Sequence, residues 1–370
     1  YHLIFIVKIK NNMRVCILGS GLTALTLAKA LVNENIYVDI EVSKNSFMIN
    51  KSRTIGISKS NFEFINNNII NIEKNIWKLK KIDIFTNNLK NEKILNFENN
   101  NDQLFSIIKN FELYKILDKS LSNSNFFNKI KFKKKLKNYK NYDLIIVTDT
   151  NSFLTKKFFN KKIEKTYNSK AYTAIINHEK INNDVAVQIF TKKGPLAFLP
   201  TSNYETSVVY SIHNSENEKD KNLIDLIQDY NFKYKINKIQ DMESFDLKSI
   251  NLRSYFHNNM LAFGDLIHRI HPLAGQGFNM TIRDTRVLLG LIKEKIDLGL
   301  ALDNSISSQF DRVLRHKNYI FSNSIDFIHN LFNLERKFNS SVLSKTIKLI
   351  GKNSSLNKMF IQIADKGINL

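Results

Sequence analysis

The stretch from Leu261 to Met280, LAFGDLIHRIHPLAGQGFNM, decides how the rest of this chain is interpreted. It begins with a short apolar run that ends at Gly264 and Asp265, as a buried strand ends where its backbone meets a ligand. A loop containing Pro272 follows. The order of strand, loop and helix predicts a site at the carboxyl end of a buried strand.

The second half of this stretch predicts a flat ligand. Gly275 and Gly277 lack the side chains that would hold the backbone away from a ring. A helical pattern then runs from Ile282 to Ile292, and the start of a helix presents unpaired N–H groups and a positive dipole end. This combination suits a flavin, one edge of which becomes negative on reduction. An ordinary strand–loop–helix corner is the alternative.

A second glycine-rich stretch supports a nucleotide-containing cofactor. The apolar strand at 14–18 is followed by Gly-x-Gly-x-x-Ala and a helical pattern, which is the setting of the dinucleotide fingerprint. Its residues are Gly19, Ser20, Gly21, Leu22, Thr23 and Ala24. Glu41 ends the next strand twenty positions after Gly21, where a carboxylate can accept hydrogen bonds from an adenosine ribose. A solvated loop charge is the alternative for Glu41.

The composition excludes several other classes of function. The net charge of +21 comes from lysines spread along the chain together with Asn and Ile, so we expect no nucleic-acid binding. One cysteine, Cys16, allows no disulfide within the chain and favours a reducing compartment. His268 and His271 lack a third ligand at a suitable spacing, so we expect no metal site.

These motifs together resemble a known family. The Gly-Asp…His-Pro-x-x-Gly-Gln-Gly-x-Asn pattern is similar to the signature of the flavoprotein aromatic hydroxylases, and its spelling is closest to the ubiquinone-biosynthesis hydroxylases. Family motifs occur in family order from Met13 to about Phe332. The resemblance implies an α/β fold with an FAD-binding Rossmann-like domain, an inserted β-sheet substrate domain and C-terminal helices.

The resemblance also implies the domain boundaries. Residues 13–61, 99–162 and 252–300 form the FAD-binding domain, residues 62–98 and 163–251 form the substrate domain, and residues 301–370 form the C-terminal helices. Residues 1–12 precede Met13 and are interpreted as an upstream extension outside the fold. Within these limits we expect amphipathic helices at 61–79, 310–332 and 342–368.

The predicted cofactor-binding residues come from four regions. Residues 52–58 are similar to the family's Arg-x-x-x-Leu-Ser strand, in which the arginine reaches the cofactor. This arginine corresponds to Arg53. The alternative is that Arg53 is simply a surface charge. The complete set is Gly19, Ser20, Gly21, Leu22, Thr23, Ala24, Glu41, Arg53, Gly264, Asp265, Pro272, Ala274, Gly275, Gln276, Gly277, Phe278 and Asn279. No side chain stands out as a catalytic base.

The expected substrate contacts lie in a different segment. Residues 194–200, GPLAFLP, resemble the family's substrate-sheet motif, and Leu196 and Phe198 then face one side, toward the substrate. The alternative is that both residues belong to the core of the sheet.

One segment departs from the family pattern. Thr148 and Thr150 flank Asp149 where the family has Ala and Gly. A Cβ at position 150 opposes a positive φ and the close approach of a ligand. This departure puts the site of the nicotinamide reductant in doubt.

The resemblance implies an FAD-dependent monooxygenase that uses NADH or NADPH and O2 to hydroxylate the ring of a polyprenylated phenol in ubiquinone biosynthesis. Two alternatives remain, which are a monooxygenase with another substrate and a non-catalytic, flavin-binding member of a ubiquinone-biosynthesis complex. We expect a cytoplasmic location, with other enzymes of the pathway as partners and with peripheral contact to the inner face of the membrane through the C-terminal helices. Covering the fold is the alternative role for these helices.

Overall fold

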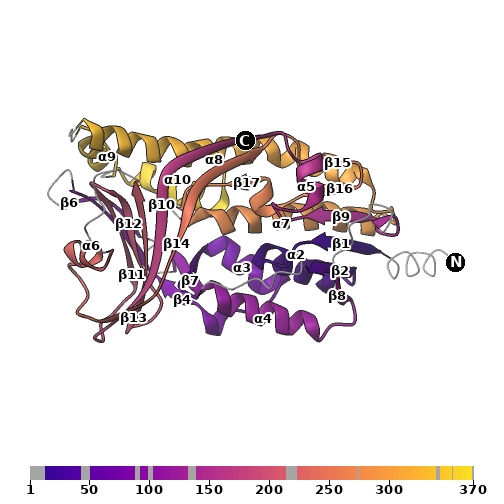
Figure 1. Ribbon diagram of the computed structural model, residues 1–370, viewed down its shortest axis with the longest axis horizontal. Coiled ribbons are helices and arrows are strands. Elements are labelled where there is room, and N and C mark those ends of the chain that lie inside the picture. Colours follow the sequence, from indigo (N-terminus) through magenta and orange to yellow (C-terminus); the bar gives the residue numbers. More distant parts are fainter. Residues whose placement is uncertain are drawn as a thin grey trace.

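A computed structural model describes residues 13–42, 51–87, 92–98, 103–131, 139–213, 223–272, 275–338, 342–351 and 353–368 (Figure 1). Two large sheets dominate this part of the chain, and helices pack on both. The predicted upstream extension at 1–12 and the predicted cofactor residue Ala274 lie outside the described residues.

The first sheet has six strands in the order β15-β16-β9-β1-β2-β8. Their bounds are Phe256–His257 for β15, Met260–Ala262 for β16, Leu144–Val147 for β9, Arg14–Leu18 for β1, Tyr37–Val42 for β2 and Phe127–Lys131 for β8. All neighbours are parallel except β15 and β16. The central strands are continuous apolar runs, and nearly all of their residues are buried, as expected for strands covered on both faces.

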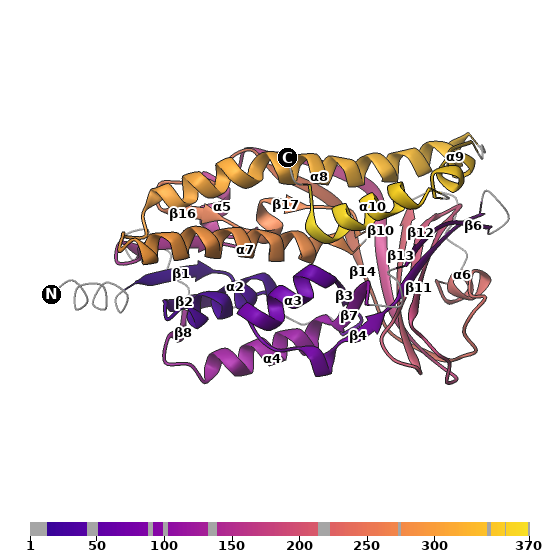
Figure 2. The same cartoon turned by 180° about the vertical axis from the view of Figure 1, so that it is seen from behind.

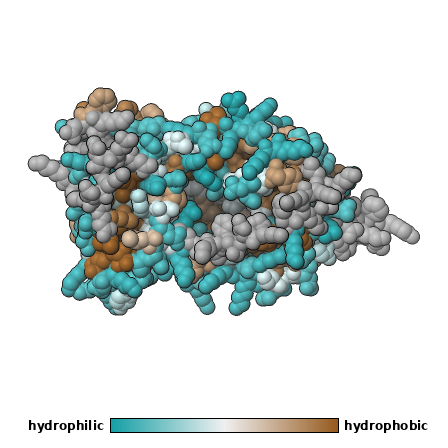
Figure 3. Space-filling view, in the orientation of Figure 1, coloured by the Kyte–Doolittle hydropathy of each residue, from teal (hydrophilic) through white to brown (hydrophobic). Residues whose placement is uncertain are grey.

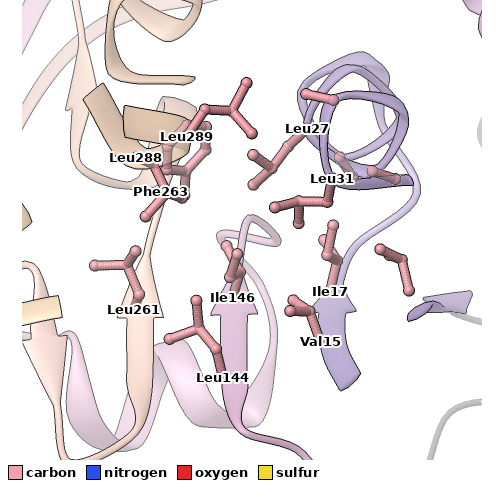
Figure 4. Close-up of a cluster of buried hydrophobic side chains, with 14 of the residues drawn as sticks. Val15, Ile17, Leu27, Leu31, Leu144, Ile146, Leu261, Phe263, Leu288 and Leu289 are labelled. Carbon is pink, nitrogen blue, oxygen red and sulfur yellow. The ribbon is translucent and has the colours of Figure 1, made fainter. Parts of the chain in front are cut away.

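Two helices that are far apart in the sequence contact each other and pack together on this sheet. Helix α2 (Leu22–Asn33) contributes Leu27 and Leu31, and helix α7 (Gln276–Asp297) contributes Leu288 and Leu289. Figure 4 shows these side chains directed toward strand residues such as Ile146. Burial of these leucines stabilises the sheet by roughly 1.5–3 kcal/mol each, and it fixes the starts of both helices at the same edge.

The second sheet has eight strands in the order β17-β14-β10-β13-β12-β11-β5-β6. Their bounds are His268–Arg269 for β17, Ile236–Leu252 for β14, Lys162–His178 for β10, Glu205–His213 for β13, Gly194–Pro200 for β12, Val185–Thr191 for β11, Lys81–Thr86 for β5 and Glu92–Glu98 for β6. The pairing is antiparallel except between β11 and β5. Helix α6 (Leu223–Asp229) lies on the face directed away from the first sheet (Figure 1).

A third, three-stranded sheet lies between the two large ones (Figure 1). It consists of β3 (Thr54–Ser58), β7 (Phe105–Lys109) and β4 (Trp77–Leu79), and helices α3 (Lys59–Asn68) and α4 (Asn110–Ser122) follow β3 and β7. The prediction of one helix over 61–79 is wrong, because α3 ends at Asn68 and Trp77 pairs with β7. The indole of Trp77 also donates to the carbonyl oxygen of Asn183 at 2.6 Å, so tertiary pairing overrides the helical pattern.

The described residues of the C-terminal segment form three helices rather than two. Helix α8 (Asn304–Lys337) packs on α7, α9 (Val342–Gly351) packs on β6, and α10 (Ser354–Lys366) packs on α3 and α7 (Figure 2). The expected helix over 342–368 is interrupted because Asn353 caps α10 through the N–H groups of Ser355 and Leu356. No helix in the described ranges combines the length and the apolar character needed to cross a membrane.

Candidate cofactor site

The fingerprint turn lies at the carboxyl end of β1. Gly19 has a φ of 133°, and a Cβ at this position would overlap the Oγ1 atom of Thr148. Gly21 precedes the first residue of α2 and offers no side-chain cap. The first N–H groups of α2 are therefore available to an anionic group, and the turn permits close backbone approach.

Glu41 lies at the carboxyl end of β2, next to this turn. The backbone N–H of Gly19 donates to the carbonyl oxygen of Glu41 at 3.3 Å. The Glu41 side chain is only 2% exposed, and its Oε2 accepts a hydrogen bond from the Tyr139 hydroxyl at 2.6 Å. Burial and the neighbouring Glu41 raise the pKa of Tyr139, so the tyrosine remains a donor. The contact between Glu41 and the ribose stays a prediction. It requires the Glu41 carboxylate to accept hydrogen bonds from both the ribose and Tyr139.

The two glycine-rich stretches meet where Gly264 contacts α2. Gly264 has a φ of 66° and opens the short 3-10 helix η4 (Gly264–Leu266). A Cβ at Gly264 would overlap the Cγ2 atom of Thr23. This contact brings the exposed Asp265 beside the start of α2, although about 240 residues separate the two stretches.

Arg53 approaches the same region from the segment before β3. Arg53 as a whole residue is exposed, and its guanidinium carbon lies 4.6 Å from the centroid of the Phe245 ring. Surrounding protein atoms still desolvate the guanidinium enough to lower its pKa, while Asp265 acts in the opposite direction. Arg53 and Asp265 are therefore close enough to interact electrostatically, and both are exposed residues.

The start of α7 has space for a flat group. Gly275 has a φ of 60° and precedes the first residue of the helix. A Cβ added to Gly277 would meet no atom within 4 Å. The Oε1 atom of Gln276 is buried without a hydrogen-bond partner in the described residues. Open space, free helical N–H groups and an orphaned polar atom fit a ring that carries hydrogen-bonding edges.

Asn279 connects the start of α7 to neighbouring elements, and its predicted contact with the cofactor stays a prediction. Its side chain is fully buried; Oδ1 accepts from the N–H of Ser58 and from Asn61, each at 3.0 Å. Its Nδ2 donates to the carbonyl oxygens of Gly56 and Gly275, at 3.0 and 3.1 Å. These hydrogen bonds anchor the start of α7 to β3 and α3.

The predicted substrate residues are placed differently from the prediction. Leu196 and Phe198 are almost fully buried in the apolar cluster that α6 covers, together with Tyr234. The structure corrects the prediction that they face the substrate, and the alternative of a sheet-core role holds. Leu199, one position further along β12, packs on the opposite face with residues of the third sheet, including Phe105. The predicted alternation of side chains between the two faces of β12 is correct. The face predicted to meet the substrate is instead the one that α6 covers, and the sequence alone cannot say which face a helix covers.

The threonines beside Asp149 are less disruptive than expected. Thr150 is not among the described non-glycine residues with a positive φ, so its Cβ causes no backbone strain. The N–H groups of Thr148 and Asp149 both donate to the carbonyl oxygen of Leu18, at 3.0 and 3.1 Å. The altered segment therefore retains a regular connection to the end of β1.

The structure also reveals buried polar residues that sequence reasoning did not connect. The Nε2 atom of His268 lies 2.5 Å from Oδ2 of Asp284, and Asn318 donates to the other carboxylate oxygen at 3.1 Å. The His271 ring packs against the ring of His329, with centroids 4.3 Å apart. The spacing of His268 and His271 was visible, but their partners on α7 and α8 are defined only by tertiary packing. Within the described residues, no group of three or more His, Cys, Asp or Glu could hold a metal ion.

Comparisons with known proteins identify the class of this fold. Residues 160–297 match the family model described as FAD binding domain. The p-nitrophenol 4-monooxygenase of Pseudomonas putida is similar in structure, with a TM-score of 0.74, 11% identity, and coverage of 97% of this chain and 100% of that chain. The 2-methyl-3-hydroxypyridine-5-carboxylic acid oxygenase has a TM-score of 0.70, 13% identity, and coverage of 90% and 95%. The fold is that of the FAD-dependent aromatic monooxygenases, and FAD is the cofactor that the matched domain supports.

Sequence comparison points to one branch of this class. The ubiquinone biosynthesis monooxygenase COQ6 of Drosophila melanogaster is 23% identical over 92% of this chain and 86% of that protein. The corresponding protein of Schizosaccharomyces pombe is 28% identical over 34% of this chain and 26% of that protein. The matches to the first three curated relatives span only about a quarter to a half of their lengths. The resemblance to the ubiquinone-biosynthesis hydroxylases is thereby confirmed.

Proposed function

We propose that this protein is an FAD-dependent monooxygenase that hydroxylates the ring of a polyprenylated phenol in ubiquinone biosynthesis, with NADH or NADPH as reductant and O2 as oxidant. The main observation in support is that the fingerprint turn and the Gly264 segment lie in contact at the carboxyl edge of the same parallel sheet. The likeness to ubiquinone biosynthesis monooxygenases supports the reaction and the substrate class.

FAD, when bound, would accept electrons from the reductant and activate O2. The residues of the chain would bind and orient it. The first N–H groups of α2, after Gly19 and Gly21, would hold its diphosphate, and Asp265 would accept a hydrogen bond from a ribityl hydroxyl. The start of α7, at Gly275 and Gly277, would stabilise negative charge on the ring, and such preorganised dipoles favour charge development.

A test of this proposal begins with the purified protein. We expect a yellow protein with bound FAD, oxidation of NADH or NADPH that a prenylated phenol stimulates, and one oxygen atom from isotopically labelled O2 in the product. Flavin-loaded protein that is not reduced at millimolar NADH or NADPH, with or without the phenol, would contradict the enzymatic proposal.

The second candidate is a flavin-binding, non-catalytic member of a ubiquinone-biosynthesis complex. The threonines at 148 and 150 favour it, because they replace Ala and Gly of the family pattern. Replacing Thr150 by Gly separates the two candidates. If reduction by the nicotinamide nucleotide appears only in the variant, position 150 is where the activity was lost. Equal reduction of both proteins supports the enzyme.

A third candidate is an aromatic monooxygenase that acts on another substrate. Activity measured with a panel of phenols with and without prenyl chains distinguishes it from the first candidate.

We further propose peripheral contact with an anionic membrane from the cytoplasmic side, and association with other enzymes of the same pathway. Exposed apolar residues on α8 and α9 support the membrane contact.

A further inference from the structure

Helix α10 ends beside the start of α3, although the residues in contact are 305 positions apart in the sequence. In Figure 2 α10 lies alongside α3 and α7. Its last turn carries Asp365, a half-buried residue. This turn therefore brings a carboxylate from the C-terminal segment to the junction of β3 and α3.

Asp365 supplies the cap that α3 lacks. Ser58 occupies the N-cap position of α3, but its side chain makes no capping hydrogen bond. The backbone N–H of Ser60, the second residue of the helix, instead donates to Oδ1 of Asp365 at 2.9 Å. A carboxylate at this position satisfies an otherwise orphaned donor and interacts favourably with the positive end of the helix dipole. A distant residue thus performs the role that a local side chain usually performs.

The backbone and the charge of Asp365 add to this contact. Its carbonyl oxygen accepts hydrogen bonds from the hydroxyl groups of Ser58 and Ser60, each at 3.2 Å. Burial lowers the pKa of Arg283, on α7, to about 10, while neighbouring carboxylates, Asp365 among them, act in the opposite direction. Burial also lowers the pKa of Arg286, and Asp365 again opposes the shift. Asp365 is therefore close enough to interact electrostatically with two arginines of α7.

Ser58 links this contact to the start of α7. Its backbone N–H donates to Oδ1 of Asn279 at 3.0 Å, and Nδ2 of Asn279 donates to the carbonyl oxygen of Gly275 at 3.1 Å. Asp365, Ser58, Asn279 and Gly275 therefore form a continuous series of hydrogen-bonded residues. The series runs from the last turn of α10 to the residue that precedes α7.

The same series borders the space expected for the flavin ring. The carbonyl oxygen of Gly56, two residues before Ser58, also accepts from Nδ2 of Asn279 at 3.0 Å. A Cβ at Gly56 would overlap the ring of Phe105 on β7, and a Cβ at Gly275 would lie 4.0 Å from the same ring. Phe105 therefore forms a wall near the start of α7. A shift of β3, with which β7 pairs, would move this wall relative to the helix.

We propose that Asp365 is a positioning residue for the flavin ring. Its hydrogen bonds to Ser58 and Ser60 hold β3 and α3 against the start of α7, so α10 acts as a clasp on the ring end of the cofactor site. The turn at Gly19 and Gly21, which is assigned to the diphosphate, has no part in these bonds. This inference rests on the proposed function, because it takes the place of the flavin ring from there.

The test uses the full-length protein, after removal of its flavin, and two probes, FAD and ADP. ADP carries the adenosine and diphosphate groups of FAD but lacks its ring, so the ratio of the two affinities reports on the ring end. Calorimetry gives both affinities. Asp365→Ala should weaken FAD binding about fivefold and leave ADP binding nearly unchanged, because only the ring end loses its support. The absorbance spectrum of the bound flavin should change as well, since it depends on the surroundings of the ring.

Asp365→Asn tests the hydrogen bond itself. Asparagine keeps an oxygen that accepts from the N–H of Ser60 and caps helices about as well as aspartate, so this variant should recover the wild-type ratio. Two other substitutions on α10 are controls. Gln362→Ala removes an exposed side chain, and Asn357→Ala removes two hydrogen bonds near the opposite end of the helix. Neither control should change the ratio of FAD affinity to ADP affinity.

The outcomes separate this inference from the proposed function. If Asp365→Ala keeps the wild-type ratio, or if Asp365→Asn loses as much as Asp365→Ala, the hydrogen bond to Ser60 does not position the ring and the inference is wrong. An equal loss in Asn357→Ala would also overturn it, because any loosening of α10 would then have the same effect. If the ratio falls as expected but no protein oxidises NADH or NADPH, the inference stands and the proposed reaction does not. A wild-type protein that binds FAD no more tightly than ADP overturns both the placement of the ring and the inference.

Discussion

Gly264 has a backbone conformation and a neighbour that both exclude a side chain. Its φ of 66° lies in the left-handed region, and a Cβ would overlap Thr23 at the start of α2. Gly264→Ala should therefore lower the free energy of unfolding by about 2 kcal/mol or more and should weaken flavin binding. Urea unfolding followed by circular dichroism measures the change.

Gly290→Ala provides the matched control. Gly290 lies within α7, and a Cβ there meets nothing within 4 Å. This substitution should stabilise the protein by about 0.5–1 kcal/mol, because alanine loses less conformational entropy in a helix. Equal effects of the two substitutions would show that the contact between Gly264 and Thr23 is not tight.

Asp265 is exposed beside the start of α2, which allows a substitution without loss of core packing. Asp265→Ala should reduce the ratio of bound flavin to protein while the far-ultraviolet circular dichroism stays unchanged. Asp297→Ala, at the exposed end of α7, is the control and should retain its flavin. Full flavin content in Asp265→Ala would remove this residue from the predicted site.

His271 gives the protein a pH-dependent stability. Its folded pKa is lowered below the unfolded value, so at pH values between the two the unfolded chain binds more protons. Stability is therefore complete above the unfolded pKa of about 6.5 and is lost as the pH falls below it, by at most about 1.4 kcal/mol per pH unit.

Urea unfolding between about pH 7.5 and about pH 5.5 tests this expectation. His271→Asn should reduce the pH dependence, whereas His316→Asn, an exposed histidine on α8, should leave it unchanged. An identical slope for the wild-type protein and His271→Asn would contradict the assignment to His271.

At the scale of elements, the start of α7 depends on Asn279. Its side chain connects this helix to β3 and α3 through hydrogen bonds to Ser58, Asn61 and Gly56. Asn279→Ala should destabilise the protein by about 2–4 kcal/mol, because buried backbone groups lose their partners. It should also weaken flavin binding through a displaced helix start.

Asn323→Ala serves as the control for this prediction, since Asn323 is an exposed asparagine whose side chain donates to the carbonyl oxygen of Tyr319 in the preceding turn of α8. Its effect should stay within about 0.5 kcal/mol. Thermal unfolding and flavin content, measured for Asn279→Ala and Asn323→Ala, test this prediction. A small effect of Asn279→Ala would mean that other contacts hold α7 in place.

At the same scale, the sequence predicted the elements with strong local signals. The strand at 14–18 and the helix after Gly21 were predicted correctly, because an apolar run and two glycines specify them locally. The segment around Trp77 was not, since its apolar spacing fits a helix but its partner strand β7 lies about thirty residues further on. Strand pairing is a non-local property, and periodicity cannot report it.

Across the whole molecule, apolar residues gather near the end that α8 and α9 form. Phe338 is 76% exposed and Leu349 is 68% exposed. Figure 3 shows hydrophobic atoms at the upper left, where Figure 1 has α9, and a second hydrophobic patch at the lower left of the same face. Lys345 lies exposed on the same helix, so this end combines apolar and basic groups.

We expect this end to dock on anionic membranes. Replacing Phe338 and Leu349 by Gln should reduce flotation with anionic liposomes severalfold, because each side chain buries apolar area in the lipid interface. Leu298→Gln is the control, because Leu298 is 66% exposed at the far end of α7. Equal flotation of all three proteins would show that another surface, or no surface, binds the membrane.

The sequence by itself determined the parallel FAD-type sheet, the two glycine stretches that meet at its edge and the class of cofactor. Glycine conformations and apolar runs are local constraints, so Gly19, Gly264 and Gly275 could be assigned from their neighbours along the chain. Only the tertiary structure decided which face of β12 is core, that Asn279 anchors a helix, and that His271 and His329 lie together. Those properties depend on which element covers which face, and packing between distant segments sets that arrangement.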